Sequence, residues 1–534
     1  MKRVFFLIII AFFSTVELSA QYNNLDALAG EYEINGQKEF FYINLINNAE
    51  DAESIDLPNQ GAFGIGIKDF KLDNGSISFK MKIGKKFADF SGKPTATNYQ
   101  GKIKDGSKQG KFELYPIVKS SAIDFGKIAG YYRFPNKREL LFTSETYEKP
   151  YLFYMENDRV VRLYPINTHT FISSKNELFN FPKDYEFNKV INLMINGQRS
   201  QGIKVSKYVE SEFTIKSDKT ELKGSLLLPT SVVKNTKYPL LIFSGPTHPG
   251  NRDLMRLYAD YFLEKGYACF IYDRRGFGES GGKKNFNTLV LKEDLVSITA
   301  ELSKSTVIDT KKIGFVAIES GAYPALLAAE NLKPFVMVMI SVSLESQIET
   351  EKYNRGLLLR HNLNNKSLIN KIESAWDQYY YLVVNDDDTK FNYTKYSKLL
   401  KEINNAKTDI PSNIKWEIPP MIKEQELSKV RGFGSFMAMN PKLSLGYISR
   451  PMFFYIPGTD QISDQKKTTK ILKSGDVKKL KIDKYYCGNC TDKLVKMERI
   501  SGSRQTHDDY KKLSDWKIST EFFDNATNWL KKHK

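Results

Sequence analysis

After its first twenty residues, the sequence of 534 residues contains no long uncharged apolar run. A membrane-spanning helix needs roughly 20 consecutive apolar residues, so none of the later chain is expected to cross a bilayer. Lysine and arginine outnumber aspartate and glutamate by 79 to 62, which gives a formal net charge of +17. Because no dense basic cluster accompanies a nucleic-acid motif, we expect a solvated basic surface and no nucleic-acid partner.

Cysteine is scarce as well, since the chain has only Cys269, Cys487 and Cys490. Cys269 lies in an apolar run, where a thiol behaves as a small hydrophobe. The other two form a C-x-x-C, but no further soft ligands are spaced for zinc, and no helix start follows a strand as in a redox motif. We expect a small structural disulfide there, with a pair of free thiols as the alternative. No metal or cofactor site is predicted.

The first twenty residues carry the pattern of a secretory signal peptide. Lys2 and Arg3 form a short positive region, residues 4–13 are apolar, and small residues lead up to Ala20. This order predicts a signal peptide over residues 1–20, cleaved after Ala20. The apolar run is too short for a span of roughly 20 residues, so a membrane anchor is not expected. We therefore expect an exported protein, in the periplasm or outside the cell.

The N-terminal half shows the patterns of β structure. Apolar side chains alternate with polar ones from Ile77 to Ile83, as in a half-buried strand, and Asp73-Asn74-Gly75 is typical of a tight hairpin turn. A second hairpin is predicted around residues 156–159. We expect an N-terminal β domain over residues 21–122 and a second β domain over residues 123–205, neither of which contains a cluster of polar side chains typical of catalysis.

From residue 206 to residue 534, short apolar runs alternate with helical patterns. The runs are 239–243, 268–272, 313–318, 335–340 and 451–456. Such runs, separated by helices, are typical of parallel strands covered on both faces. The charged and aromatic stretch over about 346–450 is too long for a simple crossover and is predicted to be a helical lid. The expected fold class is therefore α/β, with a mostly parallel central sheet and an all-β region before it.

Three of these strands carry recognisable motifs. Ile271 to Ser280 reads IYDRRGFGES, Lys312 to Val316 reads KIGFV, and Pro451 to Asp460 reads PMFFYIPGTD. In this order they resemble the α/β-hydrolases, in particular exported bacterial serine aminopeptidase-like and esterase-like hydrolases with an N-terminal β region. The resemblance implies the α/β-hydrolase fold, with the nucleophile after the second motif and the catalytic acid at the end of the third.

The nucleophile position departs from the family's pattern. The resemblance implies a serine on a sharp strand-to-helix turn, with small residues two places before and after it. Here the turn reads Ala317-Ile318-Glu319-Ser320-Gly321. With Ala317 and Gly321 at the small positions, Glu319 stands where the serine belongs. A shifted frame makes Ser320 the nucleophile but puts the β-branched Ile318 at a small position, so we favour the first frame.

The remaining catalytic groups are incomplete. The resemblance implies an acid, which matches Asp460, and a histidine in a glycine-containing turn after the last strand. That strand is predicted at 493–500, and the turn after it holds Gly502; the nearest histidine is His507, a few residues late.

The region of the oxyanion hole is also altered. It comprises Gly245, Pro246 and Thr247, together with Ser320 at the turn. Proline has no N–H to donate, so Pro246 at the donor position would leave the hole with one donor fewer. A shift by one residue would restore a donor from Thr247.

Loss of both serine and histidine indicates a protein without turnover, because triad members act as a unit. We expect a pseudo-hydrolase that binds a small ligand or a component of the cell envelope. One alternative is a carboxylic ester or peptide hydrolase that uses Ser320, Asp460 and a displaced His507. Another keeps Glu319 as a carboxylate nucleophile, which lacks a base for its second step. A third is a structural exported protein whose β half docks onto a surface component.

Overall fold

In the computed structural model the chain forms two compact units, residues 1–206 with 508–518 and residues 207–507 with 519–534. The described residues are 25–45, 53–60, 62–73, 75–84, 86–118, 125–145, 151–182, 190–195, 198–229, 236–246, 250–385, 391–423, 426–427, 434–460, 463–474, 477, 480–491, 494–496 and 515–533. The predicted signal peptide lies outside them. Within these residues, no helix combines the length and the apolar character needed to cross a membrane.

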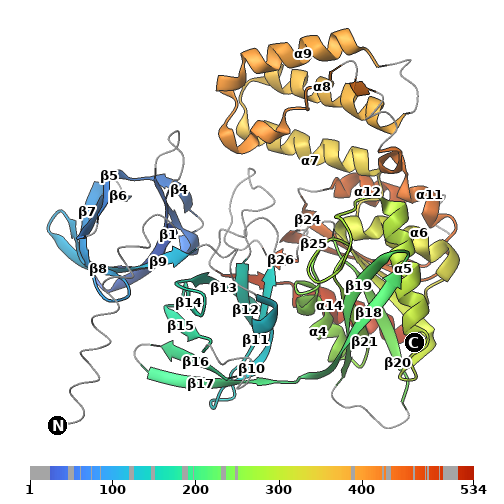
Figure 1. Cartoon of the computed structure of the whole chain (residues 1–534), viewed down its shortest axis with the longest axis horizontal. Coiled ribbons are helices and arrows are strands. Elements are labelled where there is room, and N and C mark those ends of the chain that lie inside the picture. The colour runs from blue at the N-terminus through green and yellow to red at the C-terminus, as the bar shows by residue number, and fades with distance from the viewer. Residues whose placement is uncertain are drawn as a thin grey trace. The chain divides into compact units, whose positions relative to one another are not determined.

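The first unit begins with a nine-stranded antiparallel sheet in the order β4-β3-β2-β1-β9-β8-β7-β6-β5 (Figure 1). Its strands are β1 (Leu25–Ile34), β2 (Gln37–Asn44), β3 (Ser54–Leu57), β4 (Ala62–Gly66), β5 (Lys68–Asp73), β6 (Ser76–Ile83), β7 (Lys86–Pro94), β8 (Tyr99–Asp105) and β9 (Lys108–Val118). Asp73 pairs with Ser76, which confirms the predicted hairpin. Phe79 and Phe90 stack within a core of alternating apolar residues, as the strand period requires.

A second antiparallel sheet follows and closes on itself, because β10 pairs with both β11 and β17. After α2 (Phe125–Ile128), its strands are β10 (Gly130–Arg133), β11 (Glu139–Glu145), β12 (Tyr151–Glu156), β13 (Arg159–Pro165), β14 (Thr170–Ser173), β15 (Glu177–Asn180), β16 (Val190–Ile195) and β17 (Gln198–Val205). Glu156 pairs with Arg159, which confirms the second predicted hairpin. Each sheet has a core of its own, and a further buried cluster, which includes Phe40 and Tyr164, joins the two sheets within one compact unit.

One late segment returns to the first unit. The strand β27 (Asp515–Ile518) pairs with β13, and Arg159 holds Asp515 at 2.8 Å. The sequence placed residues 206–534 in one α/β domain, so residues 508–518 correct that boundary. A four-residue strand that pairs far back along the chain has too short a pattern to be recognised in the sequence.

The second unit contains a mixed sheet in the order β18-β19-β21-β20-β22-β23-β24-β25. The strands are β18 (Tyr208–Ser217), β19 (Thr220–Pro229), β20 (Tyr238–Ser244), β21 (Ala268–Tyr272), β22 (Ile308–Ile318), β23 (Met337–Ile340), β24 (Met452–Thr459) and β25 (Ile482–Thr491). From β21 to β25 every neighbouring pair is parallel, whereas β18 and β19 join antiparallel. The five predicted apolar runs form β20 to β24.

Helices cover both faces of this sheet (Figure 1). They are α4 (Met255–Leu263), α5 (Thr288–Leu302), α6 (Ala322–Leu332), α12 (Gln465–Leu472) and α14 (Thr520–Lys532). Leu295 of α5 and Ala325 of α6 share a core with Phe270, whereas the ring of Phe522 of α14 meets Tyr455 edge-on at 5.1 Å. Because neighbouring strand residues point to opposite faces, the continuous apolar runs follow from this double coverage.

A helical insertion lies between β23 and β24. It comprises α7 (Gln347–Asn362), α8 (Lys366–Val384), α9 (Tyr393–Asn405), short 3-10 turns, and α11 (Pro441–Leu445). The first three helices share a core that includes Leu359, Ile372 and Tyr396. This insertion occupies the stretch in which the sequence predicts a lid.

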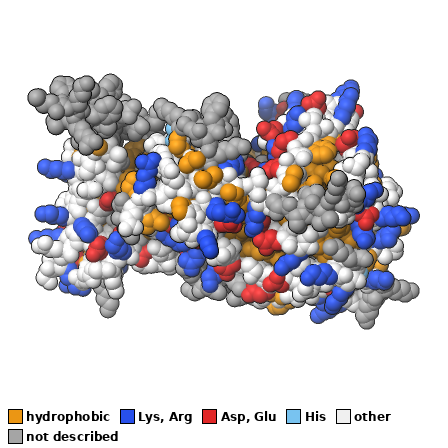
Figure 2. All heavy atoms as spheres, turned by 90° about the horizontal axis from the view of Figure 1, so that it is seen from below, with side chains coloured by type: hydrophobic (Ala, Val, Ile, Leu, Met, Phe, Trp, Pro, Cys, Tyr) orange, Lys and Arg blue, Asp and Glu red, His pale blue; other side chains and the backbone are white. Residues whose placement is uncertain are grey.

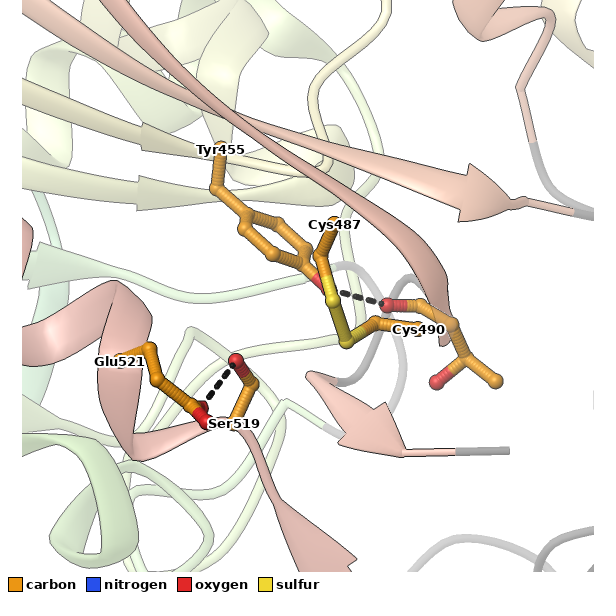
Figure 3. The surroundings of a disulfide bond; sticks show 6 residues. Tyr455, Cys487, Cys490, Ser519 and Glu521 are labelled. Carbon is orange, nitrogen blue, oxygen red and sulfur yellow. Dashed lines mark hydrogen bonds between the residues drawn. A yellow bond between two sulfur atoms is a disulfide. The ribbon is translucent and has the colours of Figure 1, made fainter. Parts of the chain in front are cut away.

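The last parallel strand corrects the sequence prediction. It is β25, not residues 493–500, of which the described part contributes only the two-residue strand β26 (Val495–Lys496). Cys487 and Cys490 lie within β25 rather than in a loop, and they form a disulfide (Figure 3). Beside it, the hydroxyl of Tyr455 donates to the carbonyl of Thr491 at 3.0 Å. An edge strand with exposed charged residues lacks the continuous apolar run that marks a central strand.

The basic excess is dispersed over the surface. On the face seen in Figure 2, Lys and Arg side chains lie among acidic and uncharged ones and do not gather in one patch. Many are paired, as in Lys371 with Glu402 at 2.9 Å and Lys352 with Asp377 at 2.9 Å.

Candidate functional site

Glu319 occupies the turn between β22 and α6. It is the first residue of a 3-10 turn (Glu319–Gly321), its φ is 48°, and the residue is 6% exposed. A left-handed backbone costs a non-glycine residue roughly 1–2 kcal/mol, so surrounding structure must hold it. Ser320 follows with an ordinary backbone and is half-buried. The strained position is therefore that of Glu319.

Gly321 explains how tightly this turn is held. A Cβ atom at residue 321 would lie 2.0 Å from the carbonyl oxygen of Ser244 and 2.4 Å from that of Gly245, so only glycine fits. The hydroxyl of Ser244 donates to the carbonyl of Gly321 at 2.7 Å. The end of β20 and the turn after β22 are thus locked together, as the small-residue pattern of the sequence indicates.

Asp460 lies just past the end of β24, on the same edge of the sheet as Glu319. The register places Ile318 beside Ile340 and Ile340 beside Tyr455, so one strand separates the two carboxylates. The carboxyl ends of parallel strands form the edge at which α/β proteins bind ligands. This arrangement brings two of the predicted site residues to one edge.

The carboxylate of Asp460 has donors in its own loop. One oxygen accepts from the N–H of Ser463 at 2.9 Å, and the other accepts from the Ser463 hydroxyl at 2.8 Å and from Nε2 of Gln465 at 2.6 Å. Asp460 is 8% exposed. These bonds fix the start of α12, which is a structural role that an aspartate after a strand often has.

The remaining predicted residues are placed only in part. Gly245 and Pro246 follow β20. Pro246 is buried, and the carbonyl oxygens of Ser244 and Gly245 lie against the turn at Gly321. Thr247, Gly502 and His507 lie outside the described residues. The structure therefore brings Glu319, Ser320 and the end of β20 together.

The IYDRRGFGES motif supplies charged groups whose roles the sequence did not reveal. Arg275 binds Asp294 of α5 with two hydrogen bonds, one of which runs from Nε to Oδ2 at 2.9 Å. Its neighbour Arg274 is 4% exposed, Nη1 is buried without a hydrogen bond, and no carboxylate of the described residues lies within 4 Å of it. Burial holds the pKa of Arg274 below its usual value, against the opposing effects of Tyr272 and Asp294.

Asp273 of the same motif ties the loops together. Its oxygens accept from the N–H of Arg252 at 2.7 Å and from that of Glu279 at 3.1 Å. Burial raises the pKa of Asp273 to about 6, although Arg252 opposes this effect. Gly278, with a φ of 51°, leaves room for this carboxylate, because a Cβ there would lie 2.4 Å from its Cγ.

The helical insertion contains a buried polar cluster of its own. Arg355 of α7 pairs with Glu417, and its guanidinium lies 3.6 Å from the centre of the Trp376 ring. Tyr380 donates to Glu351 at 2.9 Å. Burial raises the pKa of Glu417 to about 7; Arg355 opposes this effect and Glu351 adds to it.

This cluster predicts a pH dependence of stability. A carboxyl group whose pKa is raised in the folded state binds more protons there than in the unfolded chain, so stability falls as the pH rises through the window from 4.5 to about 7. We expect Glu417→Gln to flatten the melting temperature against pH between 5 and 8. Glu373→Gln, which changes a half-buried carboxylate that pairs with Arg360 on the same insertion, is the control. A wild-type protein whose melting temperature rises across this window in a Glu417-dependent way would contradict the assignment.

Contacts also connect the insertion to the sheet's edge. Tyr353 of α7 donates to the carbonyl of Asp460 at 3.4 Å, and Tyr323 of α6 donates to the carbonyl of Glu345 at 3.2 Å. Within the described residues no group of three or more His, Cys, Asp or Glu side chains is arranged to hold a metal ion.

Parts of the chain are similar to known proteins. Residues 218–407 match the family described as X-Pro dipeptidyl-peptidase (S15 family). An uncharacterised 31.7 kDa protein from the traX-finO intergenic region of Escherichia coli is 31% identical over 96 residues, 18% of this chain and 34% of that protein. The chain therefore spans about a third of the length of the curated relatives it matches.

Solved structures with a similar arrangement include two from microorganisms. The Pyrococcus furiosus esterase Pf2001 is 16% identical, with a TM-score of 0.34, over 61% of this chain and 90% of that one. The hypothetical protein PA2218 of Pseudomonas aeruginosa is 15% identical, with a TM-score of 0.37, over 62% and 95% respectively. At these scores the likeness says nothing about activity.

Proposed function

We propose that the hydrolase site of this chain, a member of the α/β-hydrolase superfamily, no longer turns over substrate. Instead, the site binds a small ligand or a component of the cell envelope. The protein acts after export, in the periplasm or outside the cell, as its first twenty residues indicate.

The observation that carries this proposal is the backbone of Glu319. A left-handed residue between a strand and a helix, with glycine two places on, is where the superfamily's nucleophile stands. A glutamate there removes the serine hydroxyl. It also adds a negative charge where an oxyanion would develop, and the buried Pro246 after β20 has no N–H to stabilise one.

Hydrolysis of an ester or peptide remains the second candidate. The matched family is described as a peptidase, and Ser320 stands next to Glu319 at the sheet's edge. In this reading Ser320 is the nucleophile, Asp460 the acid and His507 a displaced base. Against it, Asp460 is bound by Ser463 and Gln465, and Ser320 lacks the strained backbone that exposes a nucleophile.

A fluorophosphonate probe distinguishes the two candidates, since it modifies only an activated serine. We expect intact-mass measurement of the wild-type protein to show no adduct after prolonged incubation. Ser320→Ala is the matched variant, and an active serine hydrolase treated in parallel shows that the probe is reactive. Stoichiometric labelling of the wild type that Ser320→Ala abolishes would establish the hydrolase reading.

A further inference from the structure

The second unit has a cavity that neither Glu319 nor Asp460 lines. Its volume is about 220 Å³, and its walls come from the start of α5, the outer face of α6, and the segment around α11. The side chains that shape it are Tyr323, Leu327, Glu330, Met439, Leu443 and Tyr447. Ligand pockets usually measure about 300–1,000 Å³, so this cavity fits a small molecule, such as a single ring with a short side chain.

The rim of the cavity is unusually apolar for a surface. Leu443 is 68% exposed and Tyr447 is 76% exposed, and both lie at the mouth of the cavity. Leu443 lies on α11, and Tyr447 lies two residues past the end of that helix. Exposed apolar side chains beside a hollow are typical of a binding surface.

Glu330 is the charged group in this apolar wall. It lies on the last turn of α6 and is half-buried. Among the described residues nothing donates a hydrogen bond to it, and no lysine or arginine lies within 4 Å of its carboxylate, although the chain has 79 such residues. Its position near the C-terminus of the helix is unfavourable for an anion, because the helix dipole is negative there. A cation bound in the cavity would pair with the carboxylate and would offset the unfavourable effect of the helix dipole.

We propose that this cavity binds a small organic cation, an apolar body with a primary ammonium group that pairs with Glu330. Tyr447 and Leu443 cover the apolar body, and Tyr447 also offers a ring face to the cation. The site goes beyond the function proposed above, because neither Glu319 nor Asp460 lines it. It holds whether or not the sheet's edge retains activity.

The experiment compares three probes of similar shape on the full-length mature protein, by ligand-observed NMR titration at low ionic strength. They are 2-phenylethylammonium, the neutral 2-phenylethanol, and the anionic 3-phenylpropanoate. We expect the ammonium probe to bind about fivefold more tightly than the alcohol, the ratio that corresponds to a partly exposed ion pair, and the carboxylate probe not to bind.

Two variants test the assignment of the residues. Glu330→Gln should bring the ammonium probe to the affinity of the alcohol and leave the alcohol unchanged, whereas Tyr447→Ala should weaken both probes. Glu293→Gln on α5, which removes an exposed carboxylate outside the cavity, is the control and should change neither. Equal affinity of the ammonium and the alcohol for the wild type, no binding of any probe, or an unchanged affinity in Glu330→Gln would each overturn the proposal.

Discussion

Glu319→Ser alone should leave the hydrolysis of p-nitrophenyl acetate and of aminoacyl p-nitroanilides at the uncatalysed background. The substitution returns a hydroxyl to the strained turn after β22, but the sequence predicts no base for it, because Gly502 stands where the histidine is expected. In triads, a serine without its histidine contributes little, since the members act as a unit. Steady-state kinetics on the purified variant and the wild type measure this result.

The negative charge at position 319 lowers the rate of hydrolysis by a separate mechanism. A carboxylate about 4 Å from a developing oxyanion costs roughly 4 kcal/mol at an effective dielectric constant near 20, or about a thousandfold in rate. Glu319→Gln removes the charge without supplying a nucleophile, so it should also show no turnover. The joint change Glu319→Ser and Gly502→His supplies both groups at the positions that the sequence predicts for them. Wild-type turnover that Ser320→Ala abolishes would instead make Ser320 the nucleophile.

Elements with a strong local pattern could be predicted from the sequence. The hairpin at Asp73 and Ser76 follows from its turn residues, and β20 to β24 follow from continuous apolar runs. The position of the strained turn could be argued from Ala317 and Gly321, because close backbone approach requires small side chains.

Elements that depend on distant contacts could not be predicted. β25 is an edge strand whose exposed, charged residues hide its period, and β27 pairs with β13 across more than half of the chain. The apolar wall around Glu330 likewise forms only when α6 and α11 meet. The role of Arg275 in the IYDRRGFGES motif depends on Asp294, which lies on a helix further along the chain.

Arg275→Met should lower the free energy of unfolding of the second unit by about 3–5 kcal/mol, the usual cost of removing one partner of a buried ion pair. The side chain of Asp294 is 1% exposed, and Arg275 supplies both of the donors described above. Arg275 also donates to the hydroxyl of Thr220 at 3.2 Å, so the β18–β19 hairpin loses a contact as well. Urea unfolding followed by tryptophan fluorescence measures the shift, with each unit's transition fitted separately.

Arg274→Met is the matched control, because the same substitution at the preceding residue should leave the free energy of unfolding unchanged or raise it. Arg274 is more deeply buried than Arg275, yet its Nη1 has no hydrogen-bond partner, and Asp294 is already bound by Arg275. Replacing a buried charge that has no close partner by an apolar side chain of similar length is often neutral or stabilising. Adding Asp294→Asn to Arg275→Met should recover part of the lost stability, since it removes the carboxylate left without its partner. If Arg275→Met instead costs less than about 1 kcal/mol, as an exposed pair would, Asp294 is not held by this arginine in the folded protein.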